Sequence, residues 1–562
     1  MAVRYLVLAT DFDGTLAHDG QVAYETIEAI KQIRKSGRKV ILVTGRLVES
    51  LRDVFPDLDL FDAIVAENGA VLYDAASHET LPLADPPSDR FIELLRQRGV
   101  HPLEIGEAIV STWEPYEATV VEAIRDLGLE RQVIFNKGAV MTLPSGVNKA
   151  TGLLAALDRF DISERNTVGV GDAENDHAFL RLCELSAAVA NALPAVKESA
   201  DFVLKGDHGA GVVELAQRLL DDDCLECPTN RDRRILFGRT ENTNLYLDPY
   251  VQGATLIVGA SGSGKSTMAT GIVERIIEHG YQVCIVDPEG DYDAFEGVVT
   301  LGNADRSPII DEVESLLRRP MQNLAINLIG IPVDDRANFT ARLMPRLLTL
   351  RAQMGRPHWI VWDEAHQLMR SERHENELTP RDVFNQLAIT TRPSLLSEDF
   401  RAAVRTVMAV GADAVNSIRE IDPGAAPESP APAKGQALLW LQSERPNVTV
   451  FDIAEPKATL RRHRRKYALG DLTPEKSFYF RGKDGKLRLR AQNLNIFAQL
   501  AEGIDDETWT HHMRLGDIAT WFSEMIGDDE LADFARGLKD ANPSESRKGV
   551  VEEIRRRYTA FA

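Results

Sequence analysis

The stretch DFDGTLAHDG, residues 11–20, places two aspartates one residue apart, directly after the apolar run Tyr5–Ala9. An apolar run that ends in acidic residues is typical of a buried strand whose carboxyl end carries a site. Gly14 permits the sharp turn that lets Asp11 and Asp13 face the same site. By itself the pair is compatible with a polar strand end, a plain metal site or phosphate chemistry, and later segments decide between these.

Three later segments supply the groups that a phosphate-transfer site needs. Lys39–Arg46 is a strand pattern that ends near Thr44, which offers a hydroxyl to phosphate oxygens. Lys149 opens a helical pattern, and its charge can neutralise a phosphoryl group. Asp172 and Asp176 follow another strand pattern. Because ligands bind at the carboxyl ends of strands in open α/β sheets, we expect these residues to converge on one site.

The residue types in these segments predict a reaction. Asp11 is the expected nucleophile, which forms an aspartyl-phosphate. Asp13 is the expected acid and base, which protonates the leaving oxygen and then deprotonates water. Mg²⁺ prefers carboxylate oxygens and bridges them to phosphate, so the sequence predicts a magnesium-dependent phosphatase.

The four segments resemble the four motifs of the haloacid dehalogenase superfamily of phosphohydrolases, in the same order. The resemblance covers about residues 1–220 and implies that Thr44 and Lys149 contact the phosphate. It also implies a Mg²⁺ ion, to which Asp13 contributes its backbone carbonyl and Asp176 lends support. The implied metal-binding residues are Asp11, Asp13, Asp172 and Asp176.

Two further stretches are similar to the Cof-like branch of that superfamily, AIVAENGAVLYD (residues 63–74) and AVANALPAVKESADFV (residues 188–203). This branch acts largely on sugar phosphates and other small phosphate esters. It inserts a cap between the second and third motifs, which we expect over residues 83–143 of a domain that spans 1–222. A cap this short leaves room for a small substrate and would close over it to expel water.

A second phosphate-handling motif begins at Gly259. The run VGASGSGKST fits G-x-x-x-x-G-K-[ST] and lies between the strand pattern Thr255–Val258 and the helical pattern Met268–Glu278. Backbone N–H groups of such a loop wrap the nucleotide phosphates, while Lys265 reaches the β- and γ-phosphates and Ser266 coordinates Mg²⁺. The predicted ATP-binding residues are Gly259, Ser261, Gly262, Ser263, Gly264, Lys265, Ser266 and Thr267.

The partner strand of this loop is HWIVWDEAHQLM, residues 358–369. Asp363 is expected to hold Mg²⁺ through water, and Glu364 is expected to activate the attacking water. Another strand pattern ends at Asp287, for which a structural role in the following loop is an equal alternative. Asp363 and Glu364 therefore predict ATP hydrolysis. The stretch AITTRPSLL (residues 388–396) completes the set of motifs on which a family resemblance rests.

The set of motifs resembles the HerA–FtsK superfamily of P-loop ATPases over roughly residues 233–455. Known members are mostly ring-forming motors that translocate DNA, so the resemblance implies a homo-oligomer, with a hexameric ring as the candidate form. Thr390 and Thr391 stand where a polar residue senses the γ-phosphate. Arg392 and Arg405 are candidates for the arginine that acts across the subunit boundary. The β-barrel that precedes this domain in DNA translocases is not evident.

Composition limits the partners of the chain. A formal charge of −22 over 562 residues argues against constitutive nucleic-acid binding, although the basic run Arg461–Lys466 is a candidate local strip. Four cysteines suit a reducing cytoplasm, and Cys224 and Cys227 favour an ordinary linker over a zinc site. The sequence has neither a signal peptide nor an apolar run of the ~18–20 residues that span a bilayer, so a cytoplasmic protein is expected.

The fold class is α/β, with two parallel-sheet domains followed by a mainly helical segment. A polar linker over 221–230 separates the Rossmann-like phosphatase domain and its small α+β cap from the ATPase domain over 233–456. A Pro/Ala-rich loop over 422–435 interrupts the second domain. The last segment, 470–562, begins with a hairpin whose turn lies at Gly482–Gly485. Its helical patterns are Asn495–Ala501, Ile518–Met525 and Val550–Tyr558.

Three functions fit this organisation. The favoured one is a phosphatase for a small phosphate ester, possessing an attached ATPase that regulates or assembles it. The alternative is a DNA-acting motor whose first domain trims phosphates from nucleic-acid ends. A bifunctional kinase–phosphatase ranks last, because a glutamate such as Glu364 activates water, which a kinase must exclude.

Overall fold

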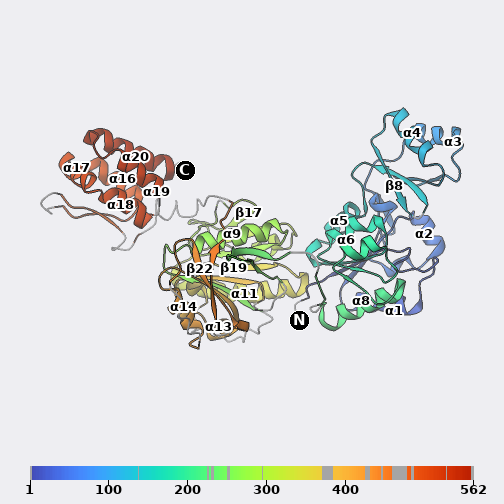
Figure 1. The fold of residues 1–562 in the computed structure, drawn as a ribbon, viewed down its shortest axis with the longest axis horizontal. Coiled ribbons are helices and arrows are strands. Elements are labelled where there is room, and N and C mark those ends of the chain that lie inside the picture. Colours follow the sequence, from blue (N-terminus) through green and yellow to red (C-terminus); the bar gives the residue numbers. More distant parts are fainter. Residues whose placement is uncertain are drawn as a thin grey trace.

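The computed structural model describes most of the chain in three parts (Figure 1). The described residues are 3–558 apart from 137, 225–226, 230–232, 250–252, 294, 370–383, 425–430, 445–446, 458–471, 473–476, 483–486 and 527. The basic run Arg461–Lys466, the middle of the Pro/Ala-rich loop and the tip of the predicted hairpin at Gly485 therefore lie outside the described residues. No described helix is long and apolar enough to cross a bilayer.

The first part is built on an eight-stranded sheet. Its central strands are short apolar runs that are buried almost throughout, as expected for a mostly parallel sheet with helices on both faces (Figure 1), whereas the edge strand β5 is exposed. The strands, in spatial order, are β12 (Phe202–Val203), β11 (Leu185–Ala188), β10 (Thr167–Gly171), β1 (Val7–Thr10), β2 (Lys39–Val43), β3 (Ala63–Ala66), β4 (Val71–Asp74) and β5 (Glu79–Pro82). Pairing is parallel from β12 to β3 and antiparallel at β4 and β5.

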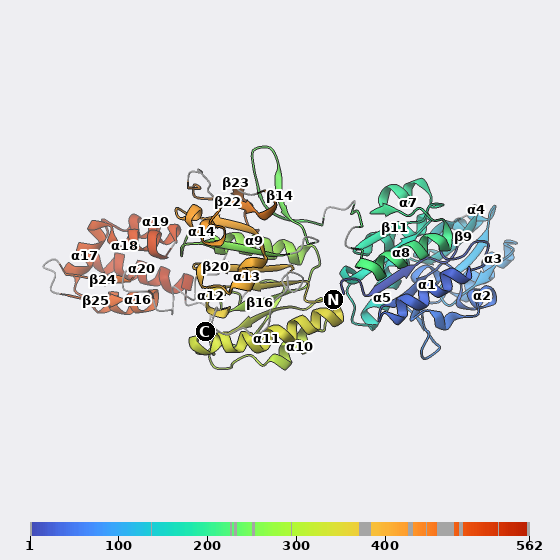
Figure 2. The same cartoon turned by 90° about the horizontal axis from the view of Figure 1, so that it is seen from below.

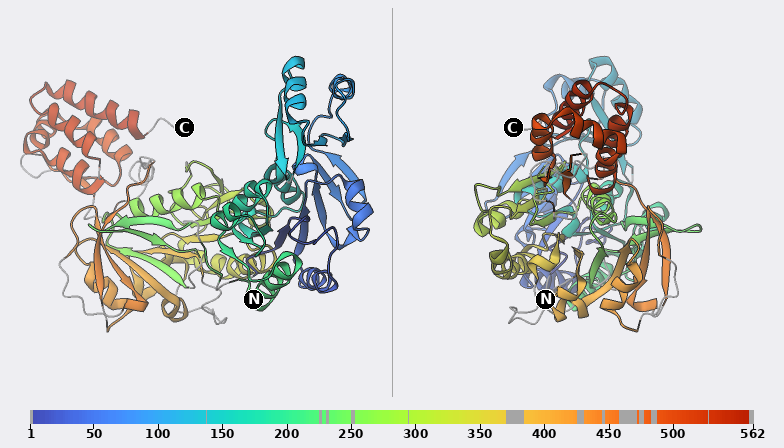
Figure 3. Two further views of the ribbon diagram at one scale, coloured as in Figure 1. Left: turned by 45° about the vertical axis from the view of Figure 1, so that its right-hand side comes forward. Right: turned by 90° about the vertical axis from the view of Figure 1, so that its left-hand side faces the viewer.

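Helices cover this sheet, and a small second unit stands above it (Figure 3). The helices are α1 (Tyr24–Lys35), α2 (Val48–Val54), α5 (Lys149–Arg159), α6 (His177–Leu182), α7 (Pro194–Ser199) and α8 (His208–Asp222). The small unit, here called the cap, has an antiparallel sheet in the order β6-β7-β9-β8 and two helices. Its elements are α3 (Asp89–Gln97), β6 (Glu104–Ile105), β7 (Val110–Trp113), α4 (Glu117–Leu127), β8 (Arg131–Asn136) and β9 (Ala139–Pro144).

The second part contains an eleven-stranded sheet. Its strands are, in spatial order, β14 (Asn244–Leu247), β13 (Ile235–Arg239), β23 (Val448–Ile453), β22 (Gln436–Leu441), β21 (Val404–Val410), β15 (Ala254–Gly259), β20 (Gln386–Thr390), β19 (Trp359–Trp362), β16 (Val283–Asp287), β18 (Asn323–Asn327) and β17 (Val298–Leu301). The sheet is parallel from β21 to β17, and an antiparallel edge extends it on the other side. Its helices are α9 (Lys265–Glu278), α10 (Ile310–Leu317), α11 (Val333–Met354), α12 (Ala365–Leu368), α13 (Glu398–Ala403) and α14 (Ala414–Ile421).

The two sheets meet at the amino-terminal ends of their strands, where α11 reaches the first part (Figure 2). Glu184, which directly precedes β11, is buried and accepts from the hydroxyl of Tyr281 at 2.7 Å, just before β16. His358, just before β19, contacts the Oδ1 atom of Asn166, just before β10, at 3.2 Å. Both hydrogen bonds join buried side chains, so the two parts share a buried polar interface.

The linker predicted over 221–230 begins later in the structure than expected. Helix α8 continues to Asp222, and Cys224 packs, 4% exposed, against the core of the first part. Asp223 binds the Arg38 guanidinium at 2.9 Å and accepts from the backbone N–H of Arg4. The first residues of the predicted linker therefore belong to the first part, because these contacts hold them on it.

The third part has its own aromatic core, which includes Phe478, Phe497 and Trp521. The predicted hairpin pairs as β24 (Phe478–Phe480) with β25 (Leu489–Ala491). The three predicted helical patterns lie in α16 (Leu494–Gly503), in α18 (Asp517–Trp521) with the π-helical turn Phe522–Ile526, and in α20 (Pro543–Tyr558). Two further helices, α17 (Asp506–Leu515) and α19 (Asp529–Gly537), were not among the predicted patterns.

Candidate functional sites

The carboxyl ends of the strands in the first part converge on a buried lysine. Asp11 follows β1, and Lys149 is the first residue of α5, which Asn148 caps by accepting from the N–H groups of the first turn. The ammonium of Lys149 lies 2.6 Å from Asp11 Oδ1 and 2.6 Å from Asp176 Oδ1. These segments therefore meet at one edge of the sheet, as the sequence predicts, and their side chains are in direct contact.

Three carboxylates in this group are arranged to receive a cation. Ligand oxygens of Asp11, Asp172 and Asp176 lie within 4.8 Å of one another, and all three residues are buried. Among the described residues this is the one group of three or more His, Cys, Asp and Glu side chains with that geometry. The group holds three carboxylates and one ammonium, and hard oxygen donors suit Mg²⁺, so the donor set fits that ion.

Asp176 also builds the loop that carries its neighbours. Its Oδ2 atom accepts from the backbone N–H groups of Asp172 at 2.9 Å and of Ala173 at 3.0 Å. Asp172 in turn accepts from the hydroxyl of Thr15 at 3.1 Å. Because one oxygen of Asp176 holds the loop and the other binds Lys149, this residue supports the site, and Asp11 and Asp172 are better placed as direct metal ligands.

Burial and charge shift the pKa values of the central pair. Burial raises the pKa of Asp11 well above its usual range, Lys149 opposes this, and the carboxylates of Asp176 and Asp172 add to the rise. Burial would lower the pKa of Lys149, but attraction to Asp11 and Asp176 outweighs it and raises that pKa. The lysine therefore stays charged, ready to contact a phosphate.

Asp13 has a partner that the sequence did not reveal. The Arg46 guanidinium donates to both oxygens of Asp13, from Nε at 2.6 Å and from Nη2 at 2.7 Å. Thr44, which is fully buried, accepts from the Arg46 backbone N–H at 3.2 Å. Gly14 has a φ of 95°, which confirms the sharp turn expected after Asp13. The carboxylate of Asp13 is therefore held in a bidentate ion pair with Arg46.

The predicted ATP loop joins β15 to α9, and α9 begins at Lys265. The Lys265 ammonium donates to the backbone carbonyl of Ala260, in its own loop, at 2.8 Å. The hydroxyl of Ser263 donates to the same carbonyl at 2.8 Å. In this arrangement Lys265 contacts a backbone carbonyl of the loop that precedes it.

The other predicted ATPase residues lie at the same edge of the second sheet. Thr390 ends β20, which separates β15 from β19, and Asp363 and Glu364 directly follow β19. Glu364 has a φ of 42°, a strained value for a residue with a side chain. His366 Nδ1 lies 3.3 Å from Glu364 Oε2 and 3.2 Å from the hydroxyl of Thr390. The proposed water-activating residue and the proposed γ-phosphate sensor thus share one neighbour.

Asp287 has a structural role in the loop that follows its strand, which is one of the two alternatives that the sequence leaves open. Its carboxylate accepts from the backbone N–H groups of Glu289 at 3.1 Å, Gly290 at 2.8 Å and Tyr292 at 2.9 Å. These bonds hold the loop that follows β16.

The two arginine candidates lie at opposite ends of the strands. Arg392 follows Thr390 closely and donates its backbone N–H to the Thr390 hydroxyl at 3.0 Å. Arg405 lies at the start of β21, where its guanidinium donates to the Ala402 carbonyl at 2.8 Å. Arg392 is therefore the candidate on the nucleotide edge.

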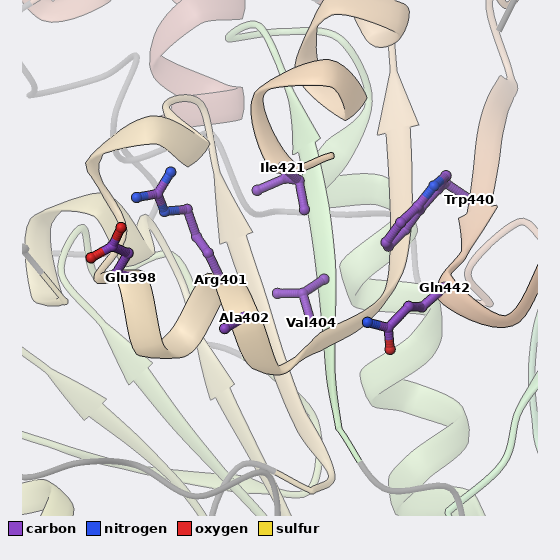
Figure 4. Close-up of a pocket in the computed structure, with 7 residues that line it drawn as sticks. All are labelled: Glu398, Arg401, Ala402, Val404, Ile421, Trp440 and Gln442. Atoms are coloured by element: carbon purple, nitrogen blue, oxygen red, sulfur yellow. The ribbon is translucent and has the colours of Figure 1, made fainter. Parts of the chain in front are cut away.

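A hollow of about 240 Å³ lies away from both sites (Figure 4). It is bounded by α13 on one side and by the end of β22 on the other, at the amino-terminal end of β21. Its lining residues are Glu398, Arg401, Ala402, Val404, Ile421, Trp440 and Gln442. Because the P-loop follows the carboxyl end of β15, which runs parallel to β21, this hollow is not the nucleotide site.

Comparison with known proteins identifies the first two parts. A family model of haloacid dehalogenase-like hydrolases matches residues 8–111 and 121–215. The phosphoglycolate phosphatase of Methanothermobacter thermautotrophicus is 30% identical over 223 residues, which cover 38% of this chain and 98% of that protein. The chain belongs to the haloacid dehalogenase-like hydrolases.

Other known proteins and a second family model are similar to parts of this haloacid dehalogenase-like chain. The phosphoglycolate phosphatase of Methanopyrus kandleri is 29% identical over 226 residues, covering 38% of the chain and 97% of that protein. A crystal structure of a haloacid dehalogenase-like hydrolase from Bacteroides thetaiotaomicron is 18% identical, with a TM-score of 0.34, and covers 38% of the chain and 99% of that structure. A family model described as the central domain of helicase HerA matches residues 236–423. The chain thus fuses a haloacid dehalogenase-like hydrolase to a HerA-like domain.

Proposed function

We propose that the chain is a magnesium-dependent phosphatase that hydrolyses a small phosphate ester through an aspartyl-phosphate on Asp11. The observation that carries this proposal is the buried group in which Lys149 bridges Asp11 and Asp176, with Asp172 beside them. A charged lysine next to a nucleophilic carboxylate draws the phosphate to it, and the surplus of carboxylates attracts a divalent cation. Bound there, Mg²⁺ would neutralise the charge that develops on the phosphoryl oxygens.

The chain's own residues divide the reaction into two steps. An oxygen of Asp11 attacks phosphorus, and the bond from phosphorus to the leaving oxygen breaks as Asp13 gives that oxygen a proton. Asp13 then takes a proton from water, whose oxygen attacks phosphorus and releases phosphate and the free Asp11 carboxylate. Because Arg46 holds both oxygens of Asp13, that ion pair must open when the substrate enters.

The proposed substrate is phosphoglycolate or another ester of similar size, including small sugar phosphates. The relatives named phosphoglycolate phosphatase match the whole hydrolase part over nearly their full lengths. The cap supports the same size, because its four-stranded sheet and two helices form a small unit above the site. An arginine released from Asp13 would also offer a cation to an acidic leaving group.

A panel of phosphate esters tests this proposal on the full chain. Purified protein with Mg²⁺ is expected to release phosphate from phosphoglycolate or a small sugar phosphate, and from p-nitrophenyl phosphate, and to lose this activity in a chelator. Restoring Mg²⁺ should restore the activity. Equal release with and without the metal, or no release from any ester, would contradict the proposal.

We further propose that the second part hydrolyses ATP, with Lys265 and Ser266 at the phosphates and Mg²⁺, Asp363 in support of the metal and Glu364 activating water. The match to the HerA central domain and the common edge of these residues support this proposal. Assembly into a homo-oligomer, with a hexameric ring as the candidate form, and Arg392 as the arginine that acts across its subunit boundary belong to the same proposal. Light scattering that finds a monomer with and without ATP would contradict the assembly.

The orientation of the two parts bears on how the sites communicate. Both sites follow the carboxyl ends of strands, whereas the two sheets touch at the amino-terminal ends, through Asn166 with His358 and Glu184 with Tyr281. Two strand lengths of four or five residues therefore separate the sites, ~30 Å at about 3.3 Å per residue. A phosphoryl group cannot pass directly between them, which weighs against a coupled kinase–phosphatase.

We propose that nucleotide occupancy instead alters the phosphatase through this interface. Glu364→Gln should bind ATP without hydrolysing it, while Lys265→Ala should bind it poorly. At saturating ATP the two variants are expected to shift the phosphatase kcat or KM in opposite directions from the wild type. Wild-type phosphatase kinetics in both variants would contradict coupling. A several-fold stimulation of ATP hydrolysis by DNA would instead favour the alternative, a DNA-acting motor with an accessory end phosphatase.

A further inference from the structure

A buried glutamate outside the catalytic group joins the phosphatase core to its cap. Glu67 is 3% exposed and opens a short 3-10 turn directly after β3. Its Oε1 atom accepts from the backbone N–H of Glu107 at 3.0 Å, and its Oε2 atom accepts from those of Ala108 at 3.0 Å and Ile109 at 3.1 Å. The three donors lie at the tip of the hairpin formed by β6 and β7, so the Glu67 carboxylate binds the cap through three hydrogen bonds.

The hairpin tip is packed against the core as well as hydrogen-bonded. A Cβ atom on Gly106 would lie 2.5 Å from Glu67 Oε1 and 2.5 Å from the Leu47 side chain, so a larger residue there would force one of these side chains or the hairpin to shift. Ala108 and Ile109 share a buried apolar cluster with core residues. The contact is therefore close and specific, and it would be lost if the hairpin moved away.

The same turn is bound to the phosphate loop on its other side. The backbone N–H of Glu67 donates to the Arg46 carbonyl at 3.0 Å, and that of Asn68 donates to the Thr44 carbonyl at 3.1 Å. The Asn68 side chain accepts from Asn175, in the loop of the metal-site aspartates, at 3.0 Å. Glu67 and Asn68 have φ values of 51° and 52°, so two consecutive residues with side chains hold a strained left-handed backbone.

We propose that Glu67 is a positioning residue that holds the cap hairpin beside the Thr44–Arg46 loop in the arrangement that accepts substrate. This role rests on the proposed phosphatase function. Both carboxylate oxygens of Glu67 are bonded to cap N–H groups, so it acts through the hairpin. If the substrate-accepting arrangement is less populated, the apparent affinity for substrate falls in proportion, so KM rises. Substrate that is bound still reacts at the same rate, so kcat changes little.

The variant Glu67→Gln tests the role because its amide keeps the size of the side chain but replaces one accepting oxygen by an NH₂ group. In the full chain with Mg²⁺, it should raise the KM for phosphoglycolate or p-nitrophenyl phosphate about tenfold and leave kcat within about threefold. Hydrogen exchange of the amides of residues 107–109 should accelerate about tenfold. The matched control is Glu107→Gln, which removes an exposed carboxylate from the same hairpin tip and should change neither quantity.

A second variant acts from the cap side. Gly106→Ala places a methyl group against Glu67 and Leu47, so it should displace the hairpin and raise KM in the same way. Wild-type exchange at residues 107–109 in Glu67→Gln would overturn the proposal. A fall in kcat with unchanged KM would overturn it too, since that pattern indicates a role in the phosphate loop alone. Exchange needs no turnover, so an inactive wild type contradicts the proposed function separately.

Discussion

The two candidate phosphate sites of this chain surround their lysines with different partners. Lys149 lies between two buried carboxylates that come from distant parts of the sequence, so folding of the first part builds that centre. Lys265 instead contacts a carbonyl of its own loop. The difference indicates that the centre of the first part is assembled by the fold from distant segments, whereas the observed contact of Lys265 forms within a single loop.

The largest expected effect tests the preassembled centre. Asp11→Asn should lower phosphate release from every ester by at least about a thousandfold, because an amide is neither a nucleophile nor a good metal ligand. The matched control is Asp19→Asn, whose exposed carboxylate lies a few residues along the same loop and should retain wild-type rates. Phosphate release by Asp11→Asn within tenfold of the wild type would break the comparison, because Asp11 would then not be the nucleophile.

The next prediction separates the second site from the first. Lys265→Ala should lower ATP hydrolysis by about a hundredfold or more, because the β- and γ-phosphates lose their cation. Without ATP, its phosphatase kcat and KM should match the wild type, since the two sites lie at opposite ends of the joined sheets. The exposed Lys434→Ala serves as the control for both assays. Loss of phosphatase activity without ATP would show that the two sites are not separate.

A smaller effect sharpens the account of the first site. Asp13→Ala should slow alkyl esters about a hundredfold and p-nitrophenyl phosphate far less, because a good leaving group needs little protonation. Arg46→Ala leaves Asp13 without its ion-pair partner, and it should change the rates for both esters by similar factors. Equal losses on the two esters in Asp13→Ala would contradict the acid and base role.

The smallest effect concerns the interface between the two parts. Burial lowers the pKa of His358 well below its usual value, and the guanidinium groups of Arg356, Arg165, Arg4 and Arg351 add to the shift. The pKa of this histidine in the unfolded chain is about 6.5. As the pH falls below that value, His358 binds a proton in the unfolded chain but stays neutral in the folded chain. This contribution to stability is present above that pH and is lost below it.

His358→Gln should remove this pH dependence. Between pH 7.5 and 5.5 the wild type should lose about 1 kcal/mol more unfolding free energy than the variant, as measured by urea unfolding of the full chain. His101→Gln, which replaces an exposed histidine in the cap, should behave as the wild type. An identical pH profile in His358→Gln would show that the interface histidine does not stay neutral.

The sequence predicts the lysines and aspartates of both sites because each lies in a short motif next to a strand. The bidentate pair of Arg46 with Asp13 was not predicted, although Arg46 stands in the quoted strand pattern, because its partner depends on where two loops meet. The role of Glu67 was not predicted either, although Glu67 stands in the quoted stretch 63–74, because its partners are backbone N–H groups, which no residue type identifies.

The interface between the two parts was also not predictable. Glu184 binds Arg4, Arg165, Arg233 and the Tyr281 hydroxyl, and these come from four separate segments. No spacing in the sequence joins such residues. The sequence did not predict the antiparallel edge of the second sheet either. Strand pairing at an edge depends on tertiary contacts rather than on the local residue pattern.

The most direct test of the account is to locate the phosphoryl group during turnover. The full chain with Mg²⁺ is mixed with p-nitrophenyl phosphate, quenched in acid within the first turnovers, and digested for mass spectrometry. The account predicts one phosphoryl group on the peptide that contains Asp11, and none on that peptide in Asp11→Asn. Steady release of phosphate with no phosphorylated Asp11 at any quench time, under conditions that trap acyl phosphates of a known phosphatase, would contradict it.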